Sequence, residues 1–154
     1  MRLLILYLFL WLPGLASAQA PLWLVNCSNQ QQSDALVCEA AQSIVLTENG
    51  QRLATTALTK RSDDEKLTAT FTLPLGLFLP AGLKVTLDEL SLLDMEITTC
   101  DASGCYATSE LTTENVEQMT NGEFLKLTVE RLDRETVEFA FGLQGLAQAV
   151  SILP

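Results

Sequence analysis

The sequence contains no histidine among its 154 residues. This absence excludes the common Ser-His and Cys-His catalytic arrangements and removes the most frequent ligand of transition metals in proteins. Positive charge is also scarce, because nine Lys and Arg residues stand against 19 Asp and Glu residues, which gives a formal net charge of −10. No cluster of Lys or Arg occurs anywhere in the chain. A surface of this kind repels phosphate backbones, so we expect no nucleic-acid partner.

Long apolar runs are absent after the first residues of the chain. The exception is the unbroken stretch Leu3 to Leu12, which follows Arg2 and precedes Pro13-Gly14 and the small-residue site Ala16-Ser17-Ala18. The stretch is shorter than the roughly 20 residues that a membrane-spanning helix needs. We therefore interpret residues 1–18 as a secretory signal peptide that is cleaved before Gln19, and not as a membrane anchor. Residues 19–154 are predicted to form a single domain without a stable membrane anchor.

All four cysteines lie in the predicted exported part, at Cys27, Cys38, Cys100 and Cys105. An even count in an oxidising compartment indicates disulfides, whereas a zinc site would require closer spacing of the first pair or histidines. A thioredoxin-like motif would require two residues between the cysteines, but Cys100 and Cys105 enclose Asp-Ala-Ser-Gly, which favours a turn. Three pairings are possible. We favour Cys27–Cys38 and Cys100–Cys105, with the second pair joining the two arms of a hairpin near the surface.

Alternation of apolar and polar residues dominates the rest of the chain and predicts half-buried strands. The predicted inward-facing positions are Leu67, Ala69, Phe71 and Leu73; Leu83, Val85 and Leu87; Leu93, Met95, Ile97 and Thr99; Leu125, Leu127 and Val129; and Val137, Phe139 and Phe141. The strand spacing is typical of an all-β fold, a two-sheet antiparallel β-sandwich. Trp23 and Tyr106 are predicted to fill core positions, and not to act as ligand platforms.

Turn and helix signals divide the strands. Asn49-Gly50 predicts a two-residue hairpin turn, residues 61–65 predict a charged loop, and residues 79–82 predict a type I turn. Residues 112–121 predict a short helix with a threonine cap and a stop at Asn121-Gly122. A second short helix, or else a strand, is expected around Leu143 to Val150. The Gln-rich stretch Asn29 to Gln32 is interpreted as the loop that the first disulfide spans.

Several of these residues recur in an order that resembles a known family. The pattern is WLVNC at 23–27, CEAAQ at 38–42, PLG at 74–76, LPAGLKV at 79–85, CDASGCYA at 100–107 and LQGL at 143–146. It resembles the invasion-associated locus B family of exported bacterial proteins, over nearly the whole predicted mature chain. The resemblance implies a β-sandwich located in the periplasm of a Gram-negative bacterium or secreted from it. The family has no defined catalytic residues to carry over, and Leu146 stands where its members often have phenylalanine.

The remaining chemistry rests on carboxylates, at Asp63-Asp64-Glu65, Asp88-Glu89 and Asp94/Glu96. The first group lacks the alternating acids of a calcium loop, and neighbouring acids of this kind are usually exposed side chains. The sequence thus identifies no catalytic residue, metal ligand, cofactor or binding residue, and sets no oligomeric state. We expect a non-enzymatic protein that binds an unidentified protein or envelope component, in the envelope or in contact with a host cell. The alternatives are an envelope-maintenance or chaperone-like accessory and, less favoured, a hydrolase with its acids clustered in a cleft.

Overall fold

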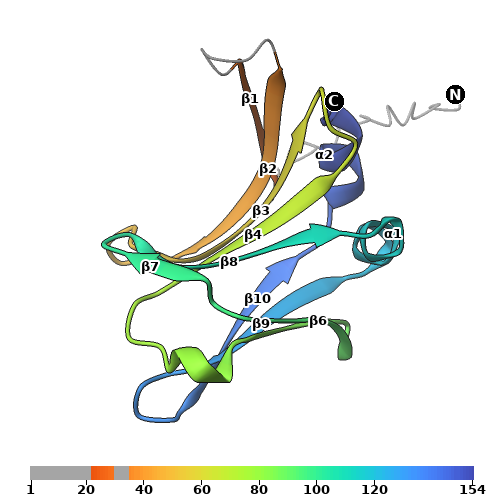
Figure 1. The fold of residues 1–154 in the computed structure, drawn as a ribbon. Helices are drawn as coiled ribbons and strands as arrows, with labels where there is room; N and C mark the ends of the chain where they lie inside the picture. The colour runs from red at the N-terminus through yellow and green to blue at the C-terminus, as the bar shows by residue number, and fades with distance from the viewer. Residues whose placement is uncertain (1–21, 30–34) are drawn as a thin grey trace, which may run out of the picture.

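The computed structural model describes residues 22–29 and 35–154, which form two antiparallel sheets and two short helices (Figure 1). The predicted two-sheet antiparallel fold with short helices is confirmed. The predicted signal peptide and most of the Gln-rich loop lie outside the described residues. The elements are β1 (Leu24–Asn29), β2 (Leu36–Val45), β3 (Arg52–Arg61), β4 (Leu67–Leu73), the 3-10 turn η1 (Leu79–Ala81), β5 (Leu83–Leu87), β6 (Leu90–Met95), β7 (Thr99–Asp101), β8 (Gly104–Leu111), α1 (Thr113–Asn121), β9 (Phe124–Glu130), β10 (Thr136–Gly142) and α2 (Leu146–Ile152).

The larger sheet has the strand order β1-β2-β3-β4-β8-β7, and the smaller sheet has the order β10-β9-β5-β6. Figure 1 shows the two sheets as stacked layers, with α1 beside the end where β8 finishes and β9 begins. β9 runs from α1 to the opposite end of the sandwich, where it meets η1. That opposite end therefore gathers η1, the β9–β10 loop and the start of β8.

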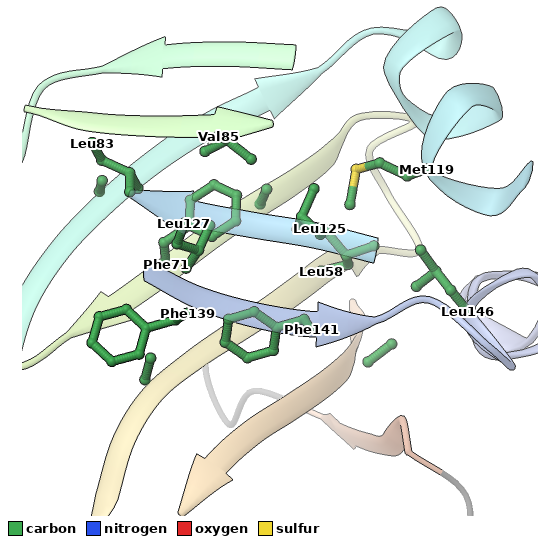
Figure 2. Packing of buried hydrophobic residues seen from close by; sticks show 14 of the residues in the cluster. Leu58, Phe71, Leu83, Val85, Met119, Leu125, Leu127, Phe139, Phe141 and Leu146 are labelled. Atoms are coloured by element: carbon green, nitrogen blue, oxygen red, sulfur yellow. The ribbon is translucent and has the colours of Figure 1, made fainter. Parts of the chain in front are cut away.

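The core lies between the sheets, on the faces that the alternation predicted. Figure 2 shows Phe71 and Leu58 of the larger sheet near Leu125, Leu127 and Phe141 of the smaller one. The predicted apolar positions of β4, β5 and β9 are all buried, because each lies on the inward face of its strand. Met119 of α1 and Leu146 of α2 close the core at the helical end (Figure 2).

Both predicted disulfides are present, and each joins residues directly opposite one another on neighbouring strands. Cys27 of β1 faces Cys38 of β2, and Cys100 of β7 faces Cys105 of β8. Cys27 and Cys100 are exposed, whereas Cys38 and Cys105 are buried. Each disulfide therefore attaches an edge strand of the larger sheet to its inner neighbour. Such edges are the most weakly held strands of a sheet, since they pair on one side only.

The continuous strand predicted from Leu93 through Thr99 to Cys100 is wrong. The alternation persists as far as Ile97, and Leu93, Met95 and Ile97 are half-buried against the core. β6 nevertheless ends at Met95 in the smaller sheet, and β7 begins at Thr99 in the larger one. The chain crosses between the sheets over residues 96–98. A pattern of period two records which side chains face inward, but it does not record which sheet supplies the hydrogen bonds.

The two-residue hairpin lies at a different position from the one predicted. Around Asn49-Gly50 the chain forms a longer loop, in which Leu46 and Gln51 form the closing backbone hydrogen bond and Gly50 has φ +70°. The two-residue turn instead joins β5 to β6 at Asp88-Glu89, where both residues have positive φ, 45° and 73°. Asp-Glu is not a preferred sequence for such a turn, so tertiary contacts must hold it.

The Asp88 carboxylate supplies those contacts. Its oxygens accept hydrogen bonds from the backbone N–H groups of Glu123 at 2.9 Å and Phe124 at 2.8 Å, just after α1. The backbone N–H of Asp88 in turn donates to the Phe124 carbonyl at 3.1 Å. The Glu89 carboxylate also pairs with Lys126. The turn is thus tied to the start of β9.

Replacing Asp88 by alanine is expected to lower the free energy of unfolding by about 1–2 kcal/mol, because two backbone donors lose a charged acceptor and the left-handed backbone loses its support. Urea denaturation would measure the change. Asp88→Asn should lose less, since asparagine accepts a hydrogen bond and tolerates this backbone conformation. Glu48→Ala, at an exposed loop position, is the control and should change stability little. Equal stability of Asp88→Ala and the control would contradict the role assigned to the carboxylate.

The helix predictions hold. α1 begins after Thr112, whose hydroxyl accepts from the Asn115 N–H while the Asn115 side chain accepts from the Thr112 N–H. It ends at Asn121, before Gly122, as the stop signal indicated. The second helix expected around Leu143 to Val150 is α2, at Leu146–Ile152, and the strand alternative is wrong.

The two predicted aromatic core positions differ. Trp23 is buried, and its Nε1 donates to the Gly142 carbonyl at 3.1 Å, so the prediction for Trp23 is confirmed. Tyr106 is only half-buried and lies outside the core, so that prediction is wrong. Tyr106 pairs with Thr99 and Thr72 on the outer face of the larger sheet, and the register directs its ring away from the core.

Candidate functional site

The first predicted acidic group organises its own loop. Arg61 donates to Asp63 through Nε and Nη2, at 2.9 and 2.8 Å, and this hydrogen bonding lowers the pKa of the Asp63 carboxyl. Asp64 accepts from the backbone N–H of Lys66 at 3.0 Å. Within residues 22–29 and 35–154, no three Cys, Asp or Glu side chains lie close enough together to hold a metal ion. This loop is therefore built from local ion pairs and turn hydrogen bonds.

The disulfide hairpin carries a second polar cluster. Asp101 accepts hydrogen bonds from the Ser103 backbone N–H at 2.7 Å and from the Tyr106 hydroxyl at 3.1 Å. The backbone hydrogen bond from Ser103 lowers the pKa of Asp101, while desolvation, followed by the contact with Asp101, raises the pKa of Tyr106. Gly104 closes the turn with φ +150°, and an added Cβ would lie 2.5 Å from the Leu73 carbonyl oxygen. These contacts fix the turn, and they leave both cysteines bonded to each other.

Asp94 and Glu96 line a groove beside η1. The groove has a volume of about 430 Å³ and is lined by Leu79, Pro80, Ala81, Gly82, Asp94, Met95, Glu96 and Ile97. Gly82, with φ +69°, lets the two sides of the groove approach closely, because an added Cβ would lie 2.6 Å from the Met95 carbonyl oxygen. Of the three predicted acidic groups, this pair alone lines the groove. The groove lies where η1 meets the segment that crosses between the sheets.

Exposed leucines lie next to the groove, at the end of the sandwich opposite α1. Leu75, Leu79 and Leu132, which we call the apolar end, are 56%, 43% and 68% exposed. The backbone brings their two loops together, since the Leu132 N–H donates to the Gly76 carbonyl at 3.0 Å and Phe78 donates to the Glu130 carbonyl at 2.8 Å. Figure 1 shows η1 and the β9–β10 loop side by side at the bottom of the molecule. Leu79 belongs to both the apolar end and the groove.

A cation covers the aromatic ring at this end. The Arg134 guanidinium lies 3.8 Å from the centroid of the Phe78 ring and also pairs with Glu130. Arg131 pairs with both Asp133 and Glu135 in the same loop. The two arginines are thus occupied by acidic neighbours. The exposed leucines remain available for an apolar contact.

Sequence reasoning did not identify the apolar end. It included residues 74–76 in the family pattern and predicted a turn at residues 79–82, and it assigned no role to the leucines of this stretch. A signal was present, however, because the turn residues of PLGLFLP, at 74–80, alternate with large apolar residues where loops usually carry polar ones. Leu132 could not have been added from the sequence, since it lies more than fifty residues further along the chain.

The two described helices, of nine and seven residues, are too short to cross a bilayer, and no described helix is long and apolar enough to do so.

The outer face of the larger sheet is lined mostly by hydroxyl groups. These belong to Thr55, Thr59, Thr68, Thr70, Thr72 and Thr108. The side chains of Ser43 and Thr55 are hydrogen-bonded at 2.8 Å on the same face. This broad face contrasts with the exposed leucines at the apolar end.

Residues 23–154 match the family described as invasion associated locus B (IalB) protein. Two relatives from Brucella abortus, strain 2308 and biovar 1 strain 9-941, carry the name invasion protein B homolog. Each is 28% identical over 129 residues, which cover 83% of this chain and 73% of the relative. The crystal structure of invasion associated protein B from Bartonella henselae superposes with a TM-score of 0.75. It does so at 20% identity, over 84% of this chain and 88% of that one, and so shows the same fold.

Proposed function

Because the chain belongs to the invasion associated locus B family, we propose that it is an exported, non-enzymatic protein that binds a partner through its apolar end. The partner belongs to the bacterial envelope or to a host cell that the bacterium contacts. Two cross-strand disulfides support export to the periplasm or beyond, because such bonds persist in oxidising compartments. The names of the Brucella and Bartonella relatives support a setting in invasion.

The observation that carries the proposal is the exposure of Leu75, Leu79 and Leu132 at one end of the sandwich. Exposing three leucines to water is unfavourable, at roughly 25 cal/mol for each Å² of apolar surface, and a partner that covers them recovers this free energy. The backbone hydrogen bonds between residues 76 and 132 and between residues 78 and 130 hold these side chains on two short, connected loops. A preorganised surface loses little conformational entropy on binding.

The polar clusters give less support to catalysis. Tyr106 donates a hydrogen bond to Asp101, and all four cysteines are in disulfides. Asp94 and Glu96 line the groove, but both are exposed and they lie only two residues apart in one segment of the chain. Glycosidases place two carboxyl groups on opposite sides of the bond they cleave, with the acid in an apolar setting. We therefore place the hydrolase alternative last.

Site-specific photo-cross-linking in the bacterium would test the proposal. A benzophenone amino acid at position 75 or 132 is expected to give one discrete, light-dependent adduct. The same amino acid at Glu114, exposed on α1 at the other end, is the matched control and should give none. Absence of an adduct at positions 75 and 132, or equal adducts from all three positions, would contradict the proposal.

The exposed leucines also suit the chaperone-like alternative, since unfolded chains present apolar segments. The same cross-linking experiment separates the two functions. A specific binding protein gives one adduct of fixed mass, whereas an accessory that holds unfolded clients gives many adducts of different mass. The mixture should then grow when the cells are heated. We favour the single adduct, because the leucines lie on short loops fixed by backbone hydrogen bonds and not on a deformable surface.

A further inference from the structure

The groove beside the apolar end combines an apolar lining with two carboxylates that form no ion pair within the described part of the chain. Leu79, Pro80, Met95 and Ile97 supply the apolar contacts. Asp94 and Glu96 form no ion pair with any residue in the described ranges 22–29 and 35–154. The cross-strand neighbour of Asp94 is Lys84, but the two side chains do not form a salt bridge. A ligand in this groove therefore meets apolar surface and negative charge together.

The order of these groups along the chain restricts the ligand further. Asp94 and Met95 end β6, and Glu96 and Ile97 follow directly; along these four residues exposed acids alternate with half-buried apolar residues. This alternation of period two matches that of side chains along an extended chain, in which residues two apart are separated by roughly 6.5–7 Å. The complement of this segment is a polypeptide in which basic and apolar residues alternate.

We propose that the groove binds an extended segment of the partner in which Lys or Arg alternates with large apolar residues. This inference rests on the proposed binding function and names the chemistry of the partner. The basic side chains pair with Asp94 and Glu96, and the apolar side chains pack against Leu79, Pro80 and Ile97 and continue onto the apolar end. A volume of about 430 Å³ is within the range of ligand sites and accommodates a few side chains, not a folded domain.

The charge of the whole protein favours the same partner. With 19 acidic and nine basic residues, the protein attracts positively charged segments at a distance, which raises the rate of encounter. General attraction does not select the groove, however, so the groove must be tested against acids elsewhere. Glu48 and Glu65 suit this purpose, because both are exposed loop residues that form no ion pair in the described part of the chain.

The test uses the purified exported protein and three fluorescein-labelled peptides, measured by fluorescence anisotropy at physiological ionic strength. The first peptide alternates lysine with leucine, the second glutamate with leucine, and the third lysine with serine. We expect the lysine-leucine peptide to bind and the other two to bind at least about tenfold more weakly, since each lacks one of the two complementary features.

Two pairs of variants locate the binding. Asp94→Asn/Glu96→Gln should weaken binding of the lysine-leucine peptide by about three- to tenfold, the range expected for two exposed ion pairs. Glu48→Gln/Glu65→Gln removes the same charge and should change binding by less than about twofold. Leu79→Ser should weaken binding, whereas Leu90→Ser, at a leucine that is 74% exposed near α1, should leave it unchanged. Thermal melting confirms that every variant is folded.

Equal weakening by both pairs of acid variants would overturn the proposal, because it would show general attraction to an acidic protein. Tight binding of the lysine-serine peptide, or no binding of the lysine-leucine peptide, would also overturn it. These failures are separate from failure of the proposed function. A discrete adduct at positions 75 and 132, found together with equal weakening of peptide binding by both pairs of acid variants, would leave the binding function standing and reject the groove.

Discussion

Replacing Phe71 by alanine is expected to lower the free energy of unfolding by about 3–5 kcal/mol, the largest effect of any single substitution considered. Phe71 is fully buried on the inward face of β4, between the sheets. Its removal leaves a cavity that the surrounding strands cannot close, because their backbone hydrogen bonds fix their positions. Denaturant unfolding, with a single transition for each variant, measures the loss.

The neighbouring residue provides the control. Thr70 lies on the outer face of the same strand and is only half-buried, so Thr70→Ala should cost less than about 1 kcal/mol. A similar loss in the free energy of unfolding at both positions would mean that each substitution disrupts β4 as a whole, and that the loss does not measure the packing between the two sheets. A loss below about 1 kcal/mol at Phe71 would contradict the sandwich core.

Removing the disulfide between Cys27 and Cys38 is expected to cost about 3 kcal/mol, against about 2 kcal/mol for the one between Cys100 and Cys105. The difference arises because the first disulfide closes a longer loop, with a sequence separation of 11 instead of 5. The variants are Cys27→Ser/Cys38→Ala and Cys100→Ser/Cys105→Ala. Alanine is used at the buried positions, so that no hydroxyl group is placed in the core.

The same variants test whether the second disulfide has a chemical role. If it only joins β7 to β8, folded Cys100→Ser/Cys105→Ala should still give the adduct at positions 75 and 132. A variant that keeps the melting temperature of the unaltered protein but loses the adduct would show that the hairpin takes part in redox chemistry or in binding. A larger loss of stability from the second pair than from the first would reject the loop-length account.

The fold could be predicted to a large extent because its signals are local. Alternation over β4, β5 and β9 identified the buried residues, and Thr112 and Gly122 marked the ends of α1. The turn residues between Cys100 and Cys105 also predicted the hairpin and its disulfide. Each of these features depends on residues close together in the sequence, so a short stretch contains most of the physical information that determines it.

The errors occurred where distant residues decide the structure. Asp88-Glu89 forms a tight turn without glycine or asparagine, because backbone donors from residues 123 and 124 hold the Asp88 carboxylate. Tyr106 looked like a core residue by its type, but the register of β8 places it on the outer face. The alternation continues through Ile97 and gives no sign that the chain changes sheet. Leu93, Met95 and Ile97 all pack against the core, although β6 and β7 belong to different sheets.

The candidate site shows this division most clearly. By itself, the sequence determined the absence of histidine chemistry, the excess of acid, the disulfides and the exported family that the chain resembles. Only the tertiary structure brought Leu132 into contact with Gly76, and only it opened a groove between η1 and the segment around Glu96. Local propensities fix which residues turn, extend or coil. A binding surface depends on the relative positions of several loops, and the packing of the two sheets sets those positions.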